Sequence, residues 1–260
     1  MTRLRLALLL AAAVGAAGAT AWAQGPLDFT GNFSFGHAVA PNTPYDGQFT
    51  FVRLRYGPPV ARVSQRIPWS HDYPLGEQHF MQIMNEVTYL HPKITETNVM
   101  ALDDPDLGLH PVVYMAEAGF WLLTDEEAAA FGKYLKKGGF VIFDDFADNR
   151  GGWNYFNAQW NRVLPGGRWV ELDGSHPIFH SFFEIPDPHA FLPPYDRDIP
   201  PVFLGVYEDN DPSKRLLAIA NYNNDISEYW EFSNEGFAPI DDTNEAYKLG
   251  VNYIMYGMTH

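Results

Sequence analysis

Residues 124–146 combine a helix signal with a buried-strand signal, and this combination restricts the fold more than any other part of the chain. Thr124 and Glu127 have the spacing of a capping box, in which each side chain accepts a hydrogen bond from the other residue's backbone amide. Gly138-Gly139 supplies a residue that can end the helix in a left-handed conformation. Phe140–Phe143 is a continuous apolar run, which is typical of a strand covered on both faces. A helix leading into such a strand predicts an α/β fold.

Asp144 and Asp145 follow the apolar run, at the carboxyl end of the expected strand. In open α/β sheets ligands bind beyond that edge, so we expect a functional site in or beside these two acids. Successive side chains of a strand diverge, so at most one of the carboxylates faces a given cleft. That acid would act as a general base or join His71 or Asp72. In the alternative, structural interpretation, Asp145 accepts hydrogen bonds from loop amides and Asp144 caps the next helix.

Hydrophobic patterns predict further elements on both sides of this pair. Strands are indicated at residues 49–56, 99–102, 111–115, 169–172, 202–207 and 215–220. Apolar positions at helical spacing indicate helices at about 76–90, 153–164 and 242–258. A short polar turn joins the last two strands and suggests a late antiparallel pair. The aromatic stripe of the second helix is interpreted as core rather than as a stacking platform for sugars. The expected fold is a mostly parallel sheet flanked by helices.

The first 23 residues have the pattern of a secretory signal peptide. Arg3 and Arg5 precede an apolar stretch that is shorter than a membrane span, and Ala21–Ala23 provides a cleavage site before Gln24. An uncleaved anchor is the alternative. We therefore expect an exported protein, periplasmic or extracellular, with no membrane span after cleavage. Residues 24–48 are rich in Gly, Pro and Asn and are expected to form an extended arm, and residues 49–260 the α/β domain.

Composition excludes several classes of function. The chain has no cysteine, which removes every mechanism based on a thiolate nucleophile. Its net charge of −15 argues against binding to nucleic acid or to an anionic membrane. The sequence also lacks a Gly-x-Ser-x-Gly elbow and the glycine motifs of nucleotide sites, so no serine hydrolase and no nucleotide cofactor is expected.

Several polar residues are candidates for chemistry beside the paired acids. Ser70-His71-Asp72 contains the residue types of a hydrolytic triad, but neighbouring side chains point in different directions and cannot form the relay. His176 and His180 have helical spacing for a shared metal, whereas a capping role for His176 and a surface position for His180 is the simpler interpretation. Carboxylate ligands would suit a hard divalent cation. The catalytic candidates are Asp145, Asp144, Asp72, His71 and His176, and the ligand-binding candidates are Trp69, Tyr73, Glu77, Arg150 and Trp153.

From Phe49 to His260 the chain resembles a bacterial family known as domain of unknown function 4159. The likeness is carried by residues 51–56, His71-Asp72-Tyr73-Pro74 with Glu77, 102–105, 138–146, 176–179, 221–225, 229–231, 244–247 and Thr259-His260. The family is similar to class I glutamine amidotransferases and to trehalose-utilisation (ThuA-like) domains. The resemblance implies a flavodoxin-like three-layer sandwich. Amidotransferases carry a cysteine on the elbow after a central strand, and Asp144-Asp145 stands near that place here, so the resemblance implies the fold without the amidotransferase activity.

Two classes of function follow from the sequence. In the first, the chain is a non-catalytic binding or interaction module of the cell envelope that holds a polar small molecule or a glycan through acids and aromatic residues. In the second, it is a hydrolase that uses a carboxylate and a histidine, with or without a metal. Convergence of Asp145, Asp72 and a histidine around an open pocket would favour the enzyme.

Overall fold

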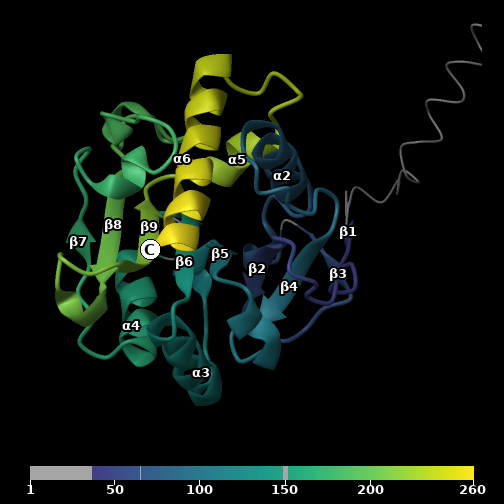
Figure 1. Ribbon diagram of the computed structural model, residues 1–260, viewed down its shortest axis with the longest axis vertical. Helices are drawn as coiled ribbons and strands as arrows, with labels where there is room; N and C mark the ends of the chain where they lie inside the picture. The colour runs from purple at the N-terminus through teal and green to yellow at the C-terminus, as the bar shows by residue number, and fades with distance from the viewer. Residues whose placement is uncertain (1–36, 65, 149–151) are drawn as a thin grey trace, which may run out of the picture. The chain divides into compact units, whose positions relative to one another are not determined.

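The computed structural model describes residues 37–64, 66–148 and 152–260, and within them seven strands form one twisted sheet (Figure 1). Five of these strands are parallel, and β8 and β7 are antiparallel additions at one side. In spatial order the strands are β4 (Thr97–Ala101), β2 (Phe51–Arg55), β5 (Val112–Ala116), β6 (Phe140–Phe146), β9 (Leu216–Tyr222), β8 (Val202–Tyr207) and β7 (Val170–Glu171). The expected mostly parallel sheet with a late antiparallel pair is therefore confirmed.

The order of the parallel strands is that of a flavodoxin-like sheet. Numbered along the chain, the five parallel strands lie in the spatial order 2-1-3-4-5. The connections therefore reverse direction between β2 and β5. Ligands of such sheets bind beyond the carboxyl ends of the strands at this switch point. The loops that follow β2, β5, β6 and β9 all reach this edge, and they carry the site described below.

Helices cover both faces of the sheet, which gives three layers. One face packs against α2 (Leu75–Val87), α5 (Ile226–Glu231) and α6 (Ile240–Thr259), and the other against α3 (Asp125–Lys136) and α4 (Trp153–Val163). Successive residues of β6 alternate between the two cores, as the pleat of a strand requires: Phe140 and Ile142 face one, Val141 and Phe143 the other. The continuous apolar run in the sequence is the consequence of this double coverage.

The start of α3 forms as its sequence predicts. The Thr124 hydroxyl accepts a hydrogen bond from the Glu127 amide at 3.1 Å, and the Glu127 carboxylate accepts one from the Thr124 amide at 2.8 Å. Gly138 ends the helical stretch with φ of 118°, a conformation that side chains disfavour. The aromatic stripe of α4 is core, since Phe156 and Trp160 are fully buried.

The carboxyl end of β6 is irregular. The pairing of β6 with β9 shifts register between Phe143 and Phe146, and Asp145 within this bulge has a left-handed backbone with φ of 53°. Such a conformation costs a residue other than glycine about 1–3 kcal/mol. The bulge turns the Asp144 and Asp145 side chains into different surroundings, and both are fully buried.

The outer edge of β4 is covered by the arm that precedes the sheet. The Asn42 side chain pairs with the Val99 backbone like a neighbouring strand, donating to its carbonyl at 3.0 Å and accepting from its amide at 2.8 Å. The Asn98 side chain makes the same pair of hydrogen bonds with the Thr43 backbone, accepting from its amide at 2.8 Å and donating to its carbonyl at 3.1 Å. Further along, β1 (His37–Ala38) pairs with β3 (Arg62–Val63) in a separate two-stranded ribbon.

The remaining connections contain short 3-10 turns. They also contain one helix, α5, that the sequence patterns did not predict. The 3-10 turns are η1 (Pro68–Ser70), η2 (Pro105–Leu109), η3 (Ala118–Phe120), η4 (Pro177–His180), η5 (Pro188–Ala190) and η6 (Glu208–Asn210). Helix α5, six residues long, was not expected. Of the helices within the described ranges, none combines the length and the apolar character needed to cross a membrane.

Candidate functional site

Acidic side chains from four loops gather at the carboxyl edge of the sheet. They come from the segment before α2, the end of β5, the end of β6 and helix α5 after β9. All except Glu231 are more than nine-tenths buried. We call the group the acid cluster, and it consists of Asp72, Glu117, Asp144, Asp145, Asp225, Glu228 and Glu231.

Asp144 holds the framework of the site together. One of its oxygens accepts hydrogen bonds from the amides of Ile226 and Ser227, at 3.0 and 3.1 Å, so this carboxylate caps helix α5. The same oxygen lies 2.9 Å from the Tyr114 hydroxyl, and the second oxygen accepts from the Asn221 amide group at 3.0 Å. The sequence analysis offered a cap of the next helix along the chain as one role for Asp144. The helix that Asp144 caps is instead α5, which follows β9.

Asp145 faces a histidine and a second acid. Its Oδ2 lies 3.2 Å from Nδ1 of His71, and Glu117 Oε1 lies 3.8 Å from the same nitrogen. The Asp145 side chain is fully buried, whereas the His71 side chain is 24% exposed and reaches the surface. A carboxylate at Nδ1 orients an imidazole and leaves Nε2 to meet a ligand or to take up a proton.

Asp72, Asp225 and Glu228 form a second group beside the first. One carboxylate oxygen from each lies within 4.8 Å of the others, as do the ligand atoms of His71, Glu117 and Asp145 in their own group. Among the described residues these are the sets able to hold a metal ion. Hard cations such as Ca²⁺ and Mg²⁺ prefer such oxygen ligands. The Ser227 hydroxyl donates to Asp72, and Asp225 caps α5 by accepting from the Glu228 amide at 3.1 Å.

Four members of the acid cluster are poorly solvated and lie near other acids, so their protonated forms are favoured. Burial, and then the charge of Asp72, raises the pKa of Glu228 to about 7 and that of Glu231 to about 8. Burial, followed by the charges of Asp145 and Asp72, raises the pKa of Asp225 well above its usual range. Burial also raises the pKa of Asp144 to about 6, against the hydrogen bond from Asn221. The cluster therefore favours protons or a cation at neutral pH.

The buried guanidinium of Arg53 offsets little of the negative charge of the acid cluster. Arg53 pairs through Nε with Glu77, and both side chains are 1% exposed. Its Nη1 donates to the Trp69 carbonyl at 3.0 Å. Because Glu77 offsets the charge of Arg53, the acid cluster keeps a large excess of negative charge over the single histidine.

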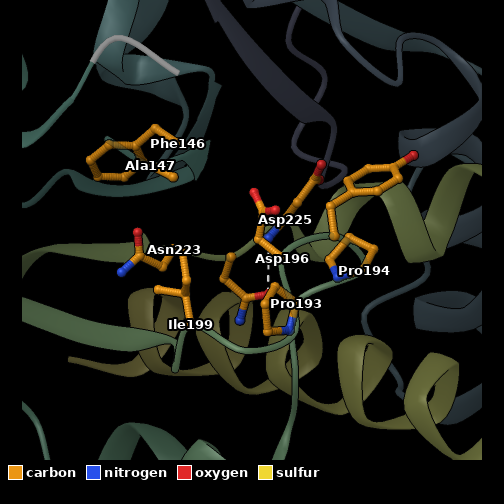
Figure 2. A pocket seen from close by; sticks show the side chains of 10 residues that line it. Phe146, Ala147, Pro193, Pro194, Asp196, Ile199, Asn223 and Asp225 are labelled. Carbon is orange, nitrogen blue, oxygen red and sulfur yellow. Dashed lines mark hydrogen bonds between the residues drawn. The ribbon is translucent and has the colours of Figure 1, made fainter. Parts of the chain in front are cut away.

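A small hollow opens beside the cluster, and Asp225 is part of its wall (Figure 2). A proline-rich loop that carries Pro193 and Asp196 faces the ends of β6 and β9 across it. The same loop contributes Tyr195, whose hydroxyl donates to Glu228. The hollow has a volume of about 30 Å³, roughly the space of one water molecule in the liquid and an order of magnitude below a typical small-molecule cleft.

The other residues suggested by the sequence lie elsewhere. Trp69 and Tyr73 are 2% and 4% exposed and pack in the core, and Glu77 is buried in an ion pair with Arg53. Trp153 is partly buried against Phe156, Trp169 and Tyr222. Arg150 lies outside the described residues.

His176 is far from the acid cluster, at the opposite end of the sheet. Its Nδ1 accepts from the Ile178 amide at 3.1 Å and caps η4, while His180 binds Glu184 and the Gly174 carbonyl. The two histidines therefore serve local structure, in agreement with the simpler interpretation of their spacing.

Several members of the cluster were missed by the sequence analysis. Glu117 directly follows β5, and Asp225 and Glu228 follow β9, so all three occupy the same kind of position as Asp144 and Asp145. The signal that could have found them is an acid at or just after the end of β5, β6 and β9, because these strand ends meet at one edge.

Comparison with known proteins identifies a family over most of the chain. The family model described as "Domain of unknown function (DUF4159)" matches residues 50–258. No curated protein matches the chain.

Proposed function

Since the chain belongs to the family of domain of unknown function DUF4159, its activity has to be inferred from its own site, and we propose that it is a binding module whose acid cluster holds a hard divalent cation. The observation that carries this proposal is the group of Asp72, Asp225 and Glu228, three buried carboxylates whose oxygens lie within 4.8 Å of one another. Burying several like charges is costly unless a counter-charge or protons accompany them.

The size and chemistry of the site favour calcium over other occupants. Two oxygens bound to one Ca²⁺ ion lie at most about 5 Å apart, and the three carboxylates meet that limit. The neighbouring hollow, which shares Asp225 with this group, has a volume of about 30 Å³ and is too small for a sugar ring. A polar ligand such as a glycan would then contact the cation at the mouth of the site rather than enter it.

The test is titration of the purified, chelator-treated protein with CaCl₂ and MgCl₂, followed by calorimetry and thermal melting. The expected result is saturable binding of Ca²⁺ with a higher melting temperature, since a ligand that binds the native state stabilises it. Glu228→Gln is expected to weaken binding strongly, whereas Asp103→Asn, a change at an exposed acid, should leave it unchanged. Absence of saturable binding by either ion would overturn the proposal.

The alternative is a hydrolase, and the geometry of His71 favours it as the second candidate. Asp145 Oδ2 lies 3.2 Å from His71 Nδ1, close enough for the carboxylate to stabilise a protonated His71 if the ring acts as a general base. Asp145 also has a left-handed backbone at the end of a central strand, and strain of this kind is concentrated at functional sites. A cation in the neighbouring carboxylates would polarise the bond to be cleaved or activate a water molecule.

An assay for hydrolysis distinguishes the binding module from the hydrolase. The protein is incubated with chromogenic esters, phosphodiesters and glycosides, with and without Ca²⁺ or Mg²⁺. His71→Gln should abolish any hydrolysis and leave the melting temperature close to that of the wild type, because the ring is partly exposed. Cation binding without turnover of any of these substrates supports the binding module.

Export is the remaining part of the proposal. It rests on Arg3, Arg5 and the apolar stretch before Ala21–Ala23, which have the pattern of a signal peptide. Fractionation of bacteria expressing the full chain should recover it outside the cytoplasm, with Gln24 as its first residue. Recovery of the uncut chain in the membrane fraction would indicate a retained anchor instead.

A further inference from the structure

A second hollow lies at the opposite end of the sheet from the acid cluster. Its wall includes Tyr207, the last residue of β8, which pairs with Leu216, the first residue of β9. Strand β9 has seven residues, so the hollow and the acid cluster are separated by roughly 20 Å along the strand. The volume of the hollow is about 400 Å³, which is within the usual range for small-molecule sites. The residues used below are His176, Tyr207, Lys214, Arg215, Tyr256 and His260.

The wall offers hydrogen-bond donors. Tyr207 is 8% exposed, and within the described residues its hydroxyl has no hydrogen-bond partner. His176 accepts a hydrogen bond at Nδ1 from the Ile178 amide, so its proton is on Nε2. Burial lowers the pKa of His176 to about 4, which keeps the ring neutral and Nε2 a donor at physiological pH. Two buried or half-buried donors on one wall favour a ligand that is rich in acceptors.

Two cationic side chains line the hollow. The chain carries a net charge of −15, yet the described residues that line the hollow include Lys214 and Arg215 and no carboxylate side chain. Arg215 is held by the carbonyls of Leu135 and Gly139, at 2.6 and 3.1 Å, and its Nε lies 3.4 Å from Glu208, which offsets part of its positive charge. Lys214 pairs with Asp209 at 2.6 Å, but both side chains are well exposed. An exposed pair contributes about 0–1 kcal/mol, so the ammonium can turn to a ligand at little cost.

The same wall has a continuous row of aromatic rings. The centroid of His176 lies 5.9 Å from that of Tyr207 and 6.0 Å from that of Tyr256. Tyr256 in turn stacks on His260 at 4.2 Å, with an angle of 7° between the planes. The Tyr256 hydroxyl accepts from the Leu216 amide at 3.1 Å, which fixes this ring against β9. A row of this kind offers flat surfaces to a planar ligand.

From these observations we infer that the hollow binds a small anion that carries a planar ring, with an aromatic carboxylate as the simplest member of the class. The carboxylate accepts from Tyr207 and His176 and faces Lys214, while the ring packs against the aromatic row. The acid cluster takes the opposite charge, so the two sites recognise different chemistry at the two ends of the sheet.

The test uses sodium benzoate as the probe and the full chain as the receptor. Benzoate is titrated to roughly 50 mM, well above a Kd near 1 mM, which corresponds to about 4 kcal/mol of binding free energy. Binding is followed by calorimetry and by the NMR signals of the imidazole protons. Saturable binding that shifts the signals of His176 and His260 is expected. Acetate, which lacks the ring, and benzylamine, which reverses the charge, should bind at least about tenfold more weakly, because each loses one of the two contacts.

Two substitutions locate the site. Tyr207→Phe removes a hydroxyl without a partner, so melting should be unchanged while benzoate binding weakens about fivefold. Lys214→Met should weaken it by a similar factor, whereas Lys248→Met, which breaks a comparable exposed pair with Glu245, should not. The inference is overturned if benzoate does not saturate, if benzylamine binds as well as benzoate, or if both substitutions at the hollow leave the Kd unchanged.

Discussion

Replacing Asp225 by Asn should stabilise the protein without a cation and remove its response to one. Asn keeps an oxygen that can accept from the Glu228 amide, so the cap of helix α5 is retained. It removes an ionisable carboxyl group, and with it the negative charge that this group carries when ionised, from the group formed with Asp72 and Glu228. A carboxylate that serves only as a helix cap would not produce these two opposite effects.

The size of the effect follows from the distance between the charges. At a separation of 4.8 Å and an effective dielectric constant of 20, two like charges repel by roughly 3 kcal/mol. Relief of one such repulsion should raise the melting temperature by roughly 6–12 °C for a domain of this size. Calcium at a hundred times its Kd should add about 2.7 kcal/mol to the wild-type protein and little to the variant.

Melting is measured at pH 8, above the pKa of about 7 of Glu228, first with a chelator and then with excess CaCl₂. The variant should melt above the wild type with the chelator, and the difference should shrink or reverse with calcium. Asp103→Asn, at an exposed position, is the matched control and should change neither value. A variant that melts at or below the wild type with the chelator, or gains as much from calcium, would refute the reasoning.

Three further predictions concern stability. In the presence of a chelator, the melting temperature should fall as pH rises from 6.5 to 8.5. The pKa values of Glu228 (about 7) and Glu231 (about 8) are raised in the folded protein, so over this window it binds more protons than the unfolded chain does. A melting temperature that rises with pH would contradict these raised pKa values. Asp144→Ala should cost roughly 3 kcal/mol in denaturant unfolding, since it leaves buried donors without an acceptor, and a loss below about 1 kcal/mol would exclude the framework role. Gly132→Ala should destabilise by about 1–3 kcal/mol, because its Cβ would lie 2.3 Å from the Val163 carbonyl oxygen, whereas Gly108→Ala, with open space around it, should have a much smaller effect.

Much of the framework could be predicted from the sequence because its signals are local. The capping box at Thr124, the glycines after α3 and the apolar run of β6 each specify their structure within a few residues. Helix α5 gave no such signal, since six residues are too few to show a helical period. Its first turn is instead held by Asp144, which lies about 80 positions earlier in the chain.

The different roles of Asp144 and Asp145 could not be predicted from the sequence. Alternation along a strand indicates that Asp144 and Asp145 diverge, but the bulge before Phe146 decides which of them meets α5 and which meets His71. The composition of the 69–73 loop was misleading for a similar reason. Its aromatic residues suggested a ligand platform, whereas the η1 turn folds Trp69 into the core.

The arm residue Asn42 has a consequence for assembly. An outer strand normally offers a row of unused amides and carbonyls to which another chain can add, and this is a common route to aggregation. Here an amide side chain imitates one residue of such an added strand and occupies both backbone groups of Val99. A second polypeptide could extend the sheet on this side only by displacing the molecule's own arm, so self-association through β4 is discouraged by the fold itself.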